Sequence, residues 1–356
     1  MNCLLRISWV FALVSCGTGV VPVNAQQART SDASAFGSDV EAKWKTIGLQ
    51  QANTMGGGPA PIPEAGKFRV FVLMGQSNMH GTARARELKA PYTEKHDRIR
   101  IWANGSWEYF VPTQRFGPGV SFAHQLAEFW PNDTIGIIKV SSGGTGIRGF
   151  EKNWSFDRAN LTFDGKKGSL YKDLMHAVAE AKRNSDPEFC GFFWKQGAAD
   201  GTKKVLAYEY YDTFKQLVLD LRKDLGAPDL PVFVPASMSD EDLLRTALSK
   251  ISDAALQKVK KPAGTTLVKK DELLESFLSY MNDASWAELR KIAGKRPYIA
   301  AVIAAQNGAG REIPNVTTIH PGKVPTGADG IHFSSEGYIR LGKITASAVE
   351  EFYKVR

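Results

Sequence analysis

Residues 68–79 read FRVFVLMGQSNM and carry the clearest structural signal in the chain. The first part, Phe68–Met74, is almost entirely apolar and is followed by Gly75. Short apolar runs that end at a glycine are typical of strands buried on both faces of a parallel sheet. Ser77 follows at the expected turn from strand to helix. This stretch therefore predicts a central strand that delivers a polar turn to the edge of a sheet.

Similar apolar runs recur along the chain and alternate with helical patterns. The further strands that we expect are Ile135–Val140, Phe189–Trp194, Leu230–Ala236, and a last one within Tyr298–Ala305 or around Val316–Ile319. Apolar residues at helical spacing predict helices at Ser121–Phe129, Leu170–Ala181 and Tyr338–Val349, the last with Ser334 or Ser335 as its cap. This alternation predicts an α/β fold, in which helices cover both faces of a parallel sheet and reactive groups lie at the carboxyl ends of its strands.

The beginning of the chain has the features of a targeting segment. Residues 1–25 combine a positive charge at Arg6, an apolar stretch and a small-residue cleavage site at Val23-Asn24-Ala25, so we expect a signal peptide. An alternative is a lipoprotein signal, because Leu13-Val14-Ser15-Cys16 resembles a lipoprotein box with Cys16 as the lipid-anchored residue. Both alternatives export the protein. Residues 26–66 are expected to be an N-terminal segment and linker.

The composition excludes several classes of protein. Of 356 residues, 43% are hydrophobic and 23% charged, as in ordinary globular proteins. The net charge of +8 is spread along the chain without a basic, aromatic-interleaved motif, so no nucleic-acid partner is expected. Beyond the leader, no apolar run is long enough to span a bilayer, and Cys190 is the remaining cysteine. The oligomeric state stays open.

Four polar segments follow predicted strands or precede the last helix. Ser77, at a strand-to-helix turn, suits a nucleophile whose own N–H stabilises an oxyanion. Asp329 and His332, three residues apart on a turn, can approach so that the carboxylate orients the imidazole. The loops Ser142–Gly146 and Trp194–Gly197 offer glycine N–H groups and a glutamine amide as hydrogen-bond donors. Each segment alone is also compatible with an ordinary turn, and no third residue at metal-ligand spacing accompanies Asp329 and His332.

Taken together and in this order, the four segments resemble the SGNH hydrolase superfamily, and within it the sialate O-acetylesterase-like and acetylxylan-type carbohydrate esterases. The resemblance rests on the blocks Val70–Gly81, Val140–Ile147, Trp194–Asp200 and Asp329–Gly342. It implies a three-layer α/β/α sandwich with a central parallel sheet, the flavodoxin-like SGNH hydrolase fold, over residues 67–356. The charged, helical stretch at about 240–297 would be a helical insertion. The family resemblance also implies that the protein uses no metal or organic cofactor.

The resemblance further implies roles for individual residues. Ser77 would be the nucleophile, His332 the general base and acid, and Asp329 the residue that orients His332. The oxyanion hole would combine the N–H groups of Ser77 and Gly144 with the Gln196 side chain. Weaker candidates for binding the substrate are Gln76, Asn78 and Trp154.

The third block departs from the pattern of these families. Members commonly carry Gln-Gly-Glu, whereas this chain has Gln196-Gly197-Ala198, so a supporting carboxylate is missing and Asp200 is a candidate replacement. Lys195 stands where a histidine is common, which changes the local charge.

The sequence therefore predicts a secreted serine esterase that removes O-acetyl groups from a carbohydrate, an acetylated glycan or sialic acid, through an acetyl-serine intermediate. Two alternatives remain. One is a broader lipase or thioesterase-like hydrolase that acts on acyl esters. The other is a non-catalytic glycan-binding protein, which Ala198 makes conceivable.

Overall fold

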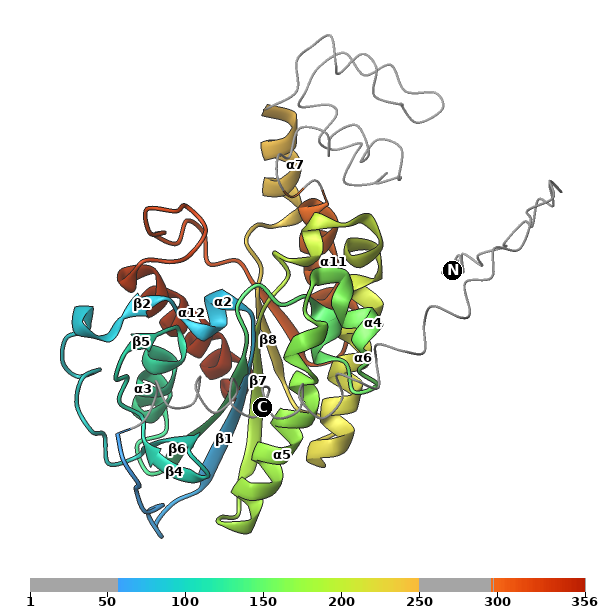
Figure 1. Ribbon diagram of the computed structural model, residues 1–356. Helices are drawn as coiled ribbons and strands as arrows, with labels where there is room; N and C mark the ends of the chain where they lie inside the picture. Colours follow the sequence, from blue (N-terminus) through green and yellow to red (C-terminus); the bar gives the residue numbers. More distant parts are fainter. Residues whose placement is uncertain (1–56, 250–295, 297, 356) are drawn as a thin grey trace, which may run out of the picture. The chain divides into compact units, whose positions relative to one another are not determined.

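The computed structural model describes residues 57–249, 296 and 298–355 (Figure 1). The predicted signal peptide, most of the 26–66 segment and most of the predicted helical insertion lie outside the described residues. At the start of that insertion, α7 (Asp240–Ser249) is helical. Within the described residues, no helix combines the length and hydropathy needed to cross a membrane.

A seven-stranded sheet forms the centre, with the strand order β4-β3-β6-β1-β7-β8-β9. Its strands are β1 (Phe68–Gly75), β3 (Ile99–Ala103), β4 (Ser106–Tyr109), β6 (Thr134–Ser141), β7 (Glu188–Lys195), β8 (Val232–Pro235) and β9 (Val316–Ile319). Neighbouring strands are parallel except for the β3–β4 hairpin. The run β6-β1-β7-β8-β9 has the 2-1-3-4-5 order of flavodoxin-like sheets, and the hairpin extends it at the β6 edge.

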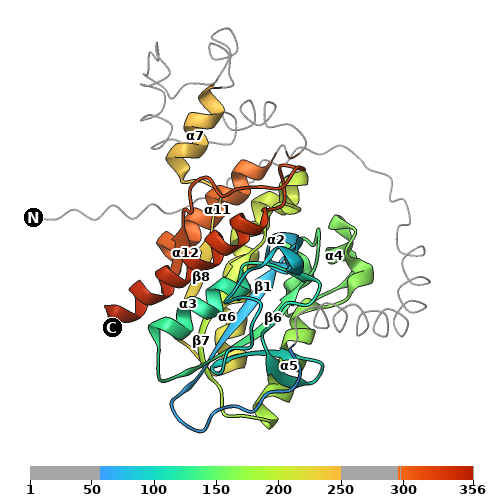
Figure 2. The ribbon, with the colours of Figure 1, turned by 90° about the vertical axis from the view of Figure 1, so that its left-hand side faces the viewer.

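Helices cover both faces of this sheet (Figure 1 and Figure 2). On one face lie α3 (Gly119–Phe129) and α12 (Ser335–Lys354), and on the other α5 (Leu170–Arg183), α6 (Lys204–Leu225) and α11 (Ile299–Glu312). Side chains of strand β1 point alternately to the two faces of the sheet. Phe71 and Leu73 pack with α3 and α12, whereas Val70 and Val72 pack with α5, α6 and α11. The expected three-layer α/β/α sandwich is confirmed.

Short elements connect these layers. They are α2 (Ser77–His80), α4 (Phe156–Ala159), the two-stranded sheet β2 (Ala83–Arg84) with β5 (Arg115–Phe116), and the 3-10 helices η1 (Ala85–Glu87), η2 (Ile147–Phe150), η3 (Asn160–Thr162), η4 (Gly165–Lys167) and η5 (Asp200–Thr202).

The structure decides the alternatives left open for the last elements. Val316–Ile319 is the final strand, as one alternative predicted, whereas the other was wrong because Tyr298–Ala305 belongs to the start of α11. Ser334 caps α12, since its side chain accepts a hydrogen bond from the Gly337 N–H at 3.2 Å. Helix α6 and the β3–β4 hairpin were not anticipated.

Candidate active site

The segments that follow β1, β6 and β7 meet at one edge because these strands are parallel neighbours. The turn after β1 lies close to the end of β7: a Cβ on Gly75 would lie 2.1 Å from the Lys195 carbonyl oxygen, so only glycine fits there. The Gln76 side-chain oxygen accepts hydrogen bonds from the N–H groups of Gly197 at 3.1 Å and Ala199 at 3.4 Å. Gln76 thus fastens the Ser77 turn to the loop after β7.

The Asp329–His332 pair forms as the spacing predicted. Asp329 Oδ1 accepts from the N–H groups of Ile331 and His332, both at 2.9 Å, and Oδ2 lies 2.6 Å from His332 Nδ1. The two backbone hydrogen bonds, with the one from the His332 ring, lower the pKa of Asp329 to about 2. An ionised carboxylate can only accept, so Nδ1 carries the proton, and Nε2, which has no partner in the described part of the chain, can act as a base.

Asn78, the residue after Ser77, connects the nucleophile turn to this pair. Its Nδ2 donates to the Ile331 carbonyl at 3.1 Å, and its Oδ1 accepts from the Phe333 N–H at 3.2 Å and from the Tyr338 hydroxyl at 3.0 Å. Asn78 therefore holds the residues on both sides of His332. The Ser77 hydroxyl has no hydrogen-bond partner among the described residues, His332 included, so the two segments are joined through Asn78 and not by a direct bond.

We expect Asn78→Ala to lower kcat for p-nitrophenyl acetate by about 10- to 100-fold with little change in KM, because small misplacements of a catalytic group carry losses of that size. Steady-state kinetics and thermal melting would measure it. Asn184→Ala is the matched control, because Asn184 caps the far end of α5. A melting point that falls while kcat stays constant would reduce Asn78 to a structural role.

Gly144 lies in the loop after β6 with a left-handed backbone (φ 69°), and nothing lies within 4 Å of where its Cβ would be. Lys167 Nζ donates hydrogen bonds to this loop at the Gly143 carbonyl (2.7 Å) and the Thr145 hydroxyl (2.9 Å). Asp164 accepts from the Gly146 N–H at 2.9 Å. The N–H groups of Ser77 and Gly144 have no partner in the described segments, so both remain available to an oxyanion.

Gln196 differs from the expectation. Its Nε2 donates to the Thr145 carbonyl at 2.9 Å and to Asp200 Oδ2 at 2.5 Å, which uses both amide hydrogens. Its Oε1 is buried without a partner in the described part of the chain. In this geometry Gln196 joins the two loops and has no hydrogen left for an oxyanion. The prediction of Gln196 as an oxyanion donor is not supported, because Asp200 and Thr145 compete for its amide.

Asp200, the candidate replacement for the carboxylate missing at Ala198, bonds to the loops on both sides of it. Its side chain is completely buried (0% exposed). Besides Gln196, it binds the Ile147 N–H, which lies 3.0 and 3.2 Å from its two oxygens. Burial raises the pKa of Asp200 to about 7 despite these hydrogen bonds. Asp200 thus connects the loop after β7 to the one that carries Gly144.

A model of the carbohydrate esterase family described as sialic acid-specific acetylesterase matches residues 67–279, more than half of the chain. The chain belongs to this family. It is therefore a carboxylic ester hydrolase. A probable carbohydrate esterase of Arabidopsis thaliana is 26% identical over 210 residues, which cover 51% of this chain and 72% of the relative.

Two solved structures resemble this esterase. The X-ray structure of the Arabidopsis protein is 20% identical with a TM-score of 0.55, and the match covers 80% of this chain and 99% of that one. It shows that the fold is shared. A carbohydrate acetylesterase from Xanthomonas citri is 15% identical with a TM-score of 0.48, over 81% of this chain and 56% of that one.

In this carbohydrate esterase, Asp200 should make stability depend on pH. The folded pKa of about 7 exceeds the ordinary value of 3.8, so at intermediate pH the folded state holds a proton that the unfolded state has lost. The free energy of unfolding should therefore fall as pH rises from about 4 to about 7. Asp200→Asn cannot titrate and should show a smaller decline, whatever its absolute stability.

Thermal melting of both proteins at about pH 4.5 and about pH 7.5 measures this effect, since ~1 kcal/mol moves the midpoint by about 2–4 °C in a domain of this size. Equal declines in the wild type and the variant would contradict the role of Asp200.

Two lysines at the site edge were not assigned a role from the sequence. Lys139 Nζ donates to the His80 carbonyl at the end of α2, at 2.7 Å, and burial lowers its pKa to about 7. Lys195 Nζ donates to the Pro235 carbonyl at 2.9 Å, and burial lowers its pKa to about 8. Both side chains are occupied by backbone carbonyls, so they support the turn after β1 and the end of β8.

The remaining substrate-binding candidate, Trp154, lies between η2 and α4. It is half-buried, and its indole N–H is buried without a partner among the described residues. Gln76 and Asn78 use their side chains within the protein, as described above. Binding of substrate by these three residues stays a prediction. No group of three potential metal ligands occurs in the described residues.

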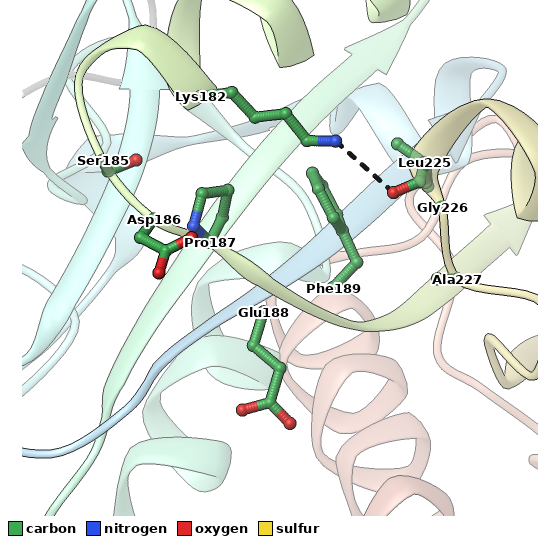
Figure 3. Close-up of a pocket in the computed structure, with 9 residues that line it drawn as sticks. All are labelled: Lys182, Ser185, Asp186, Pro187, Glu188, Phe189, Leu225, Gly226 and Ala227. Carbon is green, nitrogen blue, oxygen red and sulfur yellow. Dashed lines mark hydrogen bonds between the residues drawn. The ribbon is translucent and has the colours of Figure 1, made fainter.

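A pocket of about 510 Å³ lies elsewhere, around the amino end of β7 (Figure 3). Lys182, whose Nζ donates to the Leu225 carbonyl at 3.4 Å, lines it together with Phe189 and Gly226. The active-site segments follow the carboxyl end of the same strand, so this pocket is separate from the catalytic groups.

Proposed function

We propose that the protein is a serine O-acetylesterase that removes acetyl groups from carbohydrates through an acetyl-serine intermediate. The observation that carries this proposal is the pair of hydrogen bonds from Asn78, the residue after Ser77, to the backbone of Ile331 and Phe333 on either side of His332. The N–H groups of Ser77 and Gly144, which have no partner among the described residues, add to its support. Membership of the carbohydrate esterase family supplies the class of substrate.

The proposed reaction has two halves. Ser77 Oγ attacks the acetyl carbonyl while His332 Nε2 accepts its proton and Asp329 stabilises the imidazolium. The oxyanion accepts hydrogen bonds from the Ser77 and Gly144 N–H groups. His332 then protonates the sugar oxygen, which leaves as a hydroxyl. Water, activated by His332, attacks the acetyl-serine and releases acetate.

A screen of acetate release from acetylated xylan, O-acetylated sialic acids and other acetylated glycans would test the proposal. We expect release from at least one of them and faster hydrolysis of p-nitrophenyl acetate than of the octanoate. Rates that rise with acyl length would favour the lipase-like alternative. Glycan binding without ester hydrolysis would favour the non-catalytic alternative.

We also propose that the protein is exported. Its support is the sequence of residues 1–25, which lie outside the described residues. Sequencing the N-terminus of the mature protein separates the alternatives: Gln26 indicates a cleaved signal peptide, and a lipid-modified Cys16 indicates a membrane anchor. An unprocessed Met1 in the cytoplasmic fraction would contradict export.

A further inference from the structure

Phe163 is an unusual surface residue. Its side chain is 82% exposed, and it ends η3 with a left-handed backbone (φ 64°). Bulky side chains rarely adopt this conformation, and exposed aromatic rings gain nothing from core packing. Strained residues persist where the surrounding structure fixes them and tend to cluster at functional sites. Neither the fold nor the mechanism above accounts for this ring.

The neighbours of Phe163 place it beside the loop that carries Gly144. A Cβ on Gly146 would lie 2.7 Å from the Thr162 side chain, so the residue before Phe163 packs directly on this loop. The residue after it, Asp164, accepts the hydrogen bond from the Gly146 N–H at 2.9 Å. The residues on both sides of Phe163 are therefore attached to the loop that carries Gly144.

A second contact ties the Phe163 ring to the loop after β7. Lys203 Nζ lies 5.2 Å from the ring centroid, a cation–π distance. Lys203 directly follows η5, which begins with the buried Asp200. The Phe163 ring and the Lys203 ammonium group therefore lie next to each other, close to the point where Asp200 connects the loops after β6 and β7.

We propose that Phe163 and Lys203 form a sugar-binding subsite of the esterase, in which the ring stacks on the apolar face of a pyranose while the ammonium donates to its oxygens. The proposal rests on the proposed function. Aromatic faces supply rigid apolar contact area, and ammonium groups are hydrogen-bond donors only, which suits hydroxyl and carboxylate oxygens. The subsite would hold the carbohydrate part of the substrate, so small acetyl esters without a sugar would not use it.

The variant Phe163→Gly separates binding from structure. Glycine adopts φ of +64° without strain, so the melting point should stay the same or rise. We expect KM for acetylated xylan or O-acetylated sialyllactose, whichever the wild type hydrolyses, to rise about tenfold, which corresponds to ~1.4 kcal/mol. Hydrolysis of p-nitrophenyl acetate should not change, and Phe163→Tyr should keep the wild-type KM.

Leu219→Ala is the matched control, because Leu219 is an exposed apolar residue (47%) further along α6 and outside the site. It should leave KM unchanged. Equal losses of Phe163→Gly on p-nitrophenyl acetate and on the glycan would overturn the proposal, as would an unchanged KM for the glycan.

A binding experiment keeps this inference separate from the esterase activity. In a Ser77→Ala background, calorimetry with the same two glycans should show about tenfold weaker binding after Phe163→Gly. If the protein that keeps Ser77 hydrolyses no acetyl ester while Phe163→Gly still weakens glycan binding, the proposed function is refuted and the subsite stands. Unchanged binding beside intact serine-dependent hydrolysis would refute the subsite alone.

Discussion

Ser77→Ala is expected to lower kcat/KM for p-nitrophenyl acetate by at least about 10⁴-fold, the size of loss seen when a serine nucleophile is removed. Alanine keeps the turn but offers no oxygen for the acyl group. Because the Ser77 hydroxyl has no partner among the described residues, its loss should change the free energy of unfolding by less than about 0.5 kcal/mol. Kinetics and thermal melting of the same preparation measure both effects.

Ser106→Ala is the control, since Ser106 lies on the edge strand β4, away from the catalytic segments. It should retain full activity. A Ser77→Ala protein that keeps more than a few per cent of the wild-type rate would contradict the acetyl-serine mechanism. A large loss of stability would instead indicate that Ser77 supports the fold.

Much of the sheet was predictable because its central strands are buried on both faces. Uninterrupted apolar runs such as Phe68–Met74 leave few alternatives to a strand in a parallel sheet. The β3–β4 hairpin was missed although its signal is present. Asn104-Gly105 joins the two strands, both residues have positive φ (52° and 77°), and such a pair is a strong hairpin signal.

Two helices show where apolar runs mislead. Tyr298–Ala305 is as apolar as a buried strand, but it is rich in alanine, which favours helix, and from Ile299 on it belongs to α11. Helix α6 presents a buried stripe that includes Leu206, Tyr210 and Phe214 at helical spacing. This pattern predicts an amphipathic helix, and it was available from the sequence.

In the site, local features were predictable and long-range ones were not. The Asp329–His332 contact follows from a three-residue spacing on a turn. The state of the Gln196 amide depends on Thr145, 51 residues earlier, and on a buried carboxylate whose position only the fold determines. The hydrogen bond from Asn78 to Ile331 joins residues 253 positions apart in the sequence, so no local pattern could predict it.

His332→Ala should lower kcat/KM about as strongly as Ser77→Ala, by at least about 10⁴-fold, since the serine hydroxyl is a weak nucleophile without a base. Kinetics with p-nitrophenyl acetate measure the loss, and added imidazole should restore part of the rate by replacing the missing ring. His176→Ala, on the exposed side of α5, is the control and should remain fully active. An active His332→Ala protein would show that another base serves Ser77.

The double variant Ser77→Ala/His332→Ala tests whether the two residues act as one unit. If His332 works only by activating Ser77, removing it from a protein that already lacks the serine should cause no further loss. Independent contributions would multiply instead, to a loss of about 10⁸-fold. In the structure Asn78 connects the two segments, and Ser77 and His332 share no direct hydrogen bond. The mechanism nevertheless requires that the effects of the two substitutions depend on each other, and the double variant measures that dependence. If the losses in kcat/KM of the two single variants multiply in the double variant, His332 contributes to catalysis in some way other than by activating Ser77.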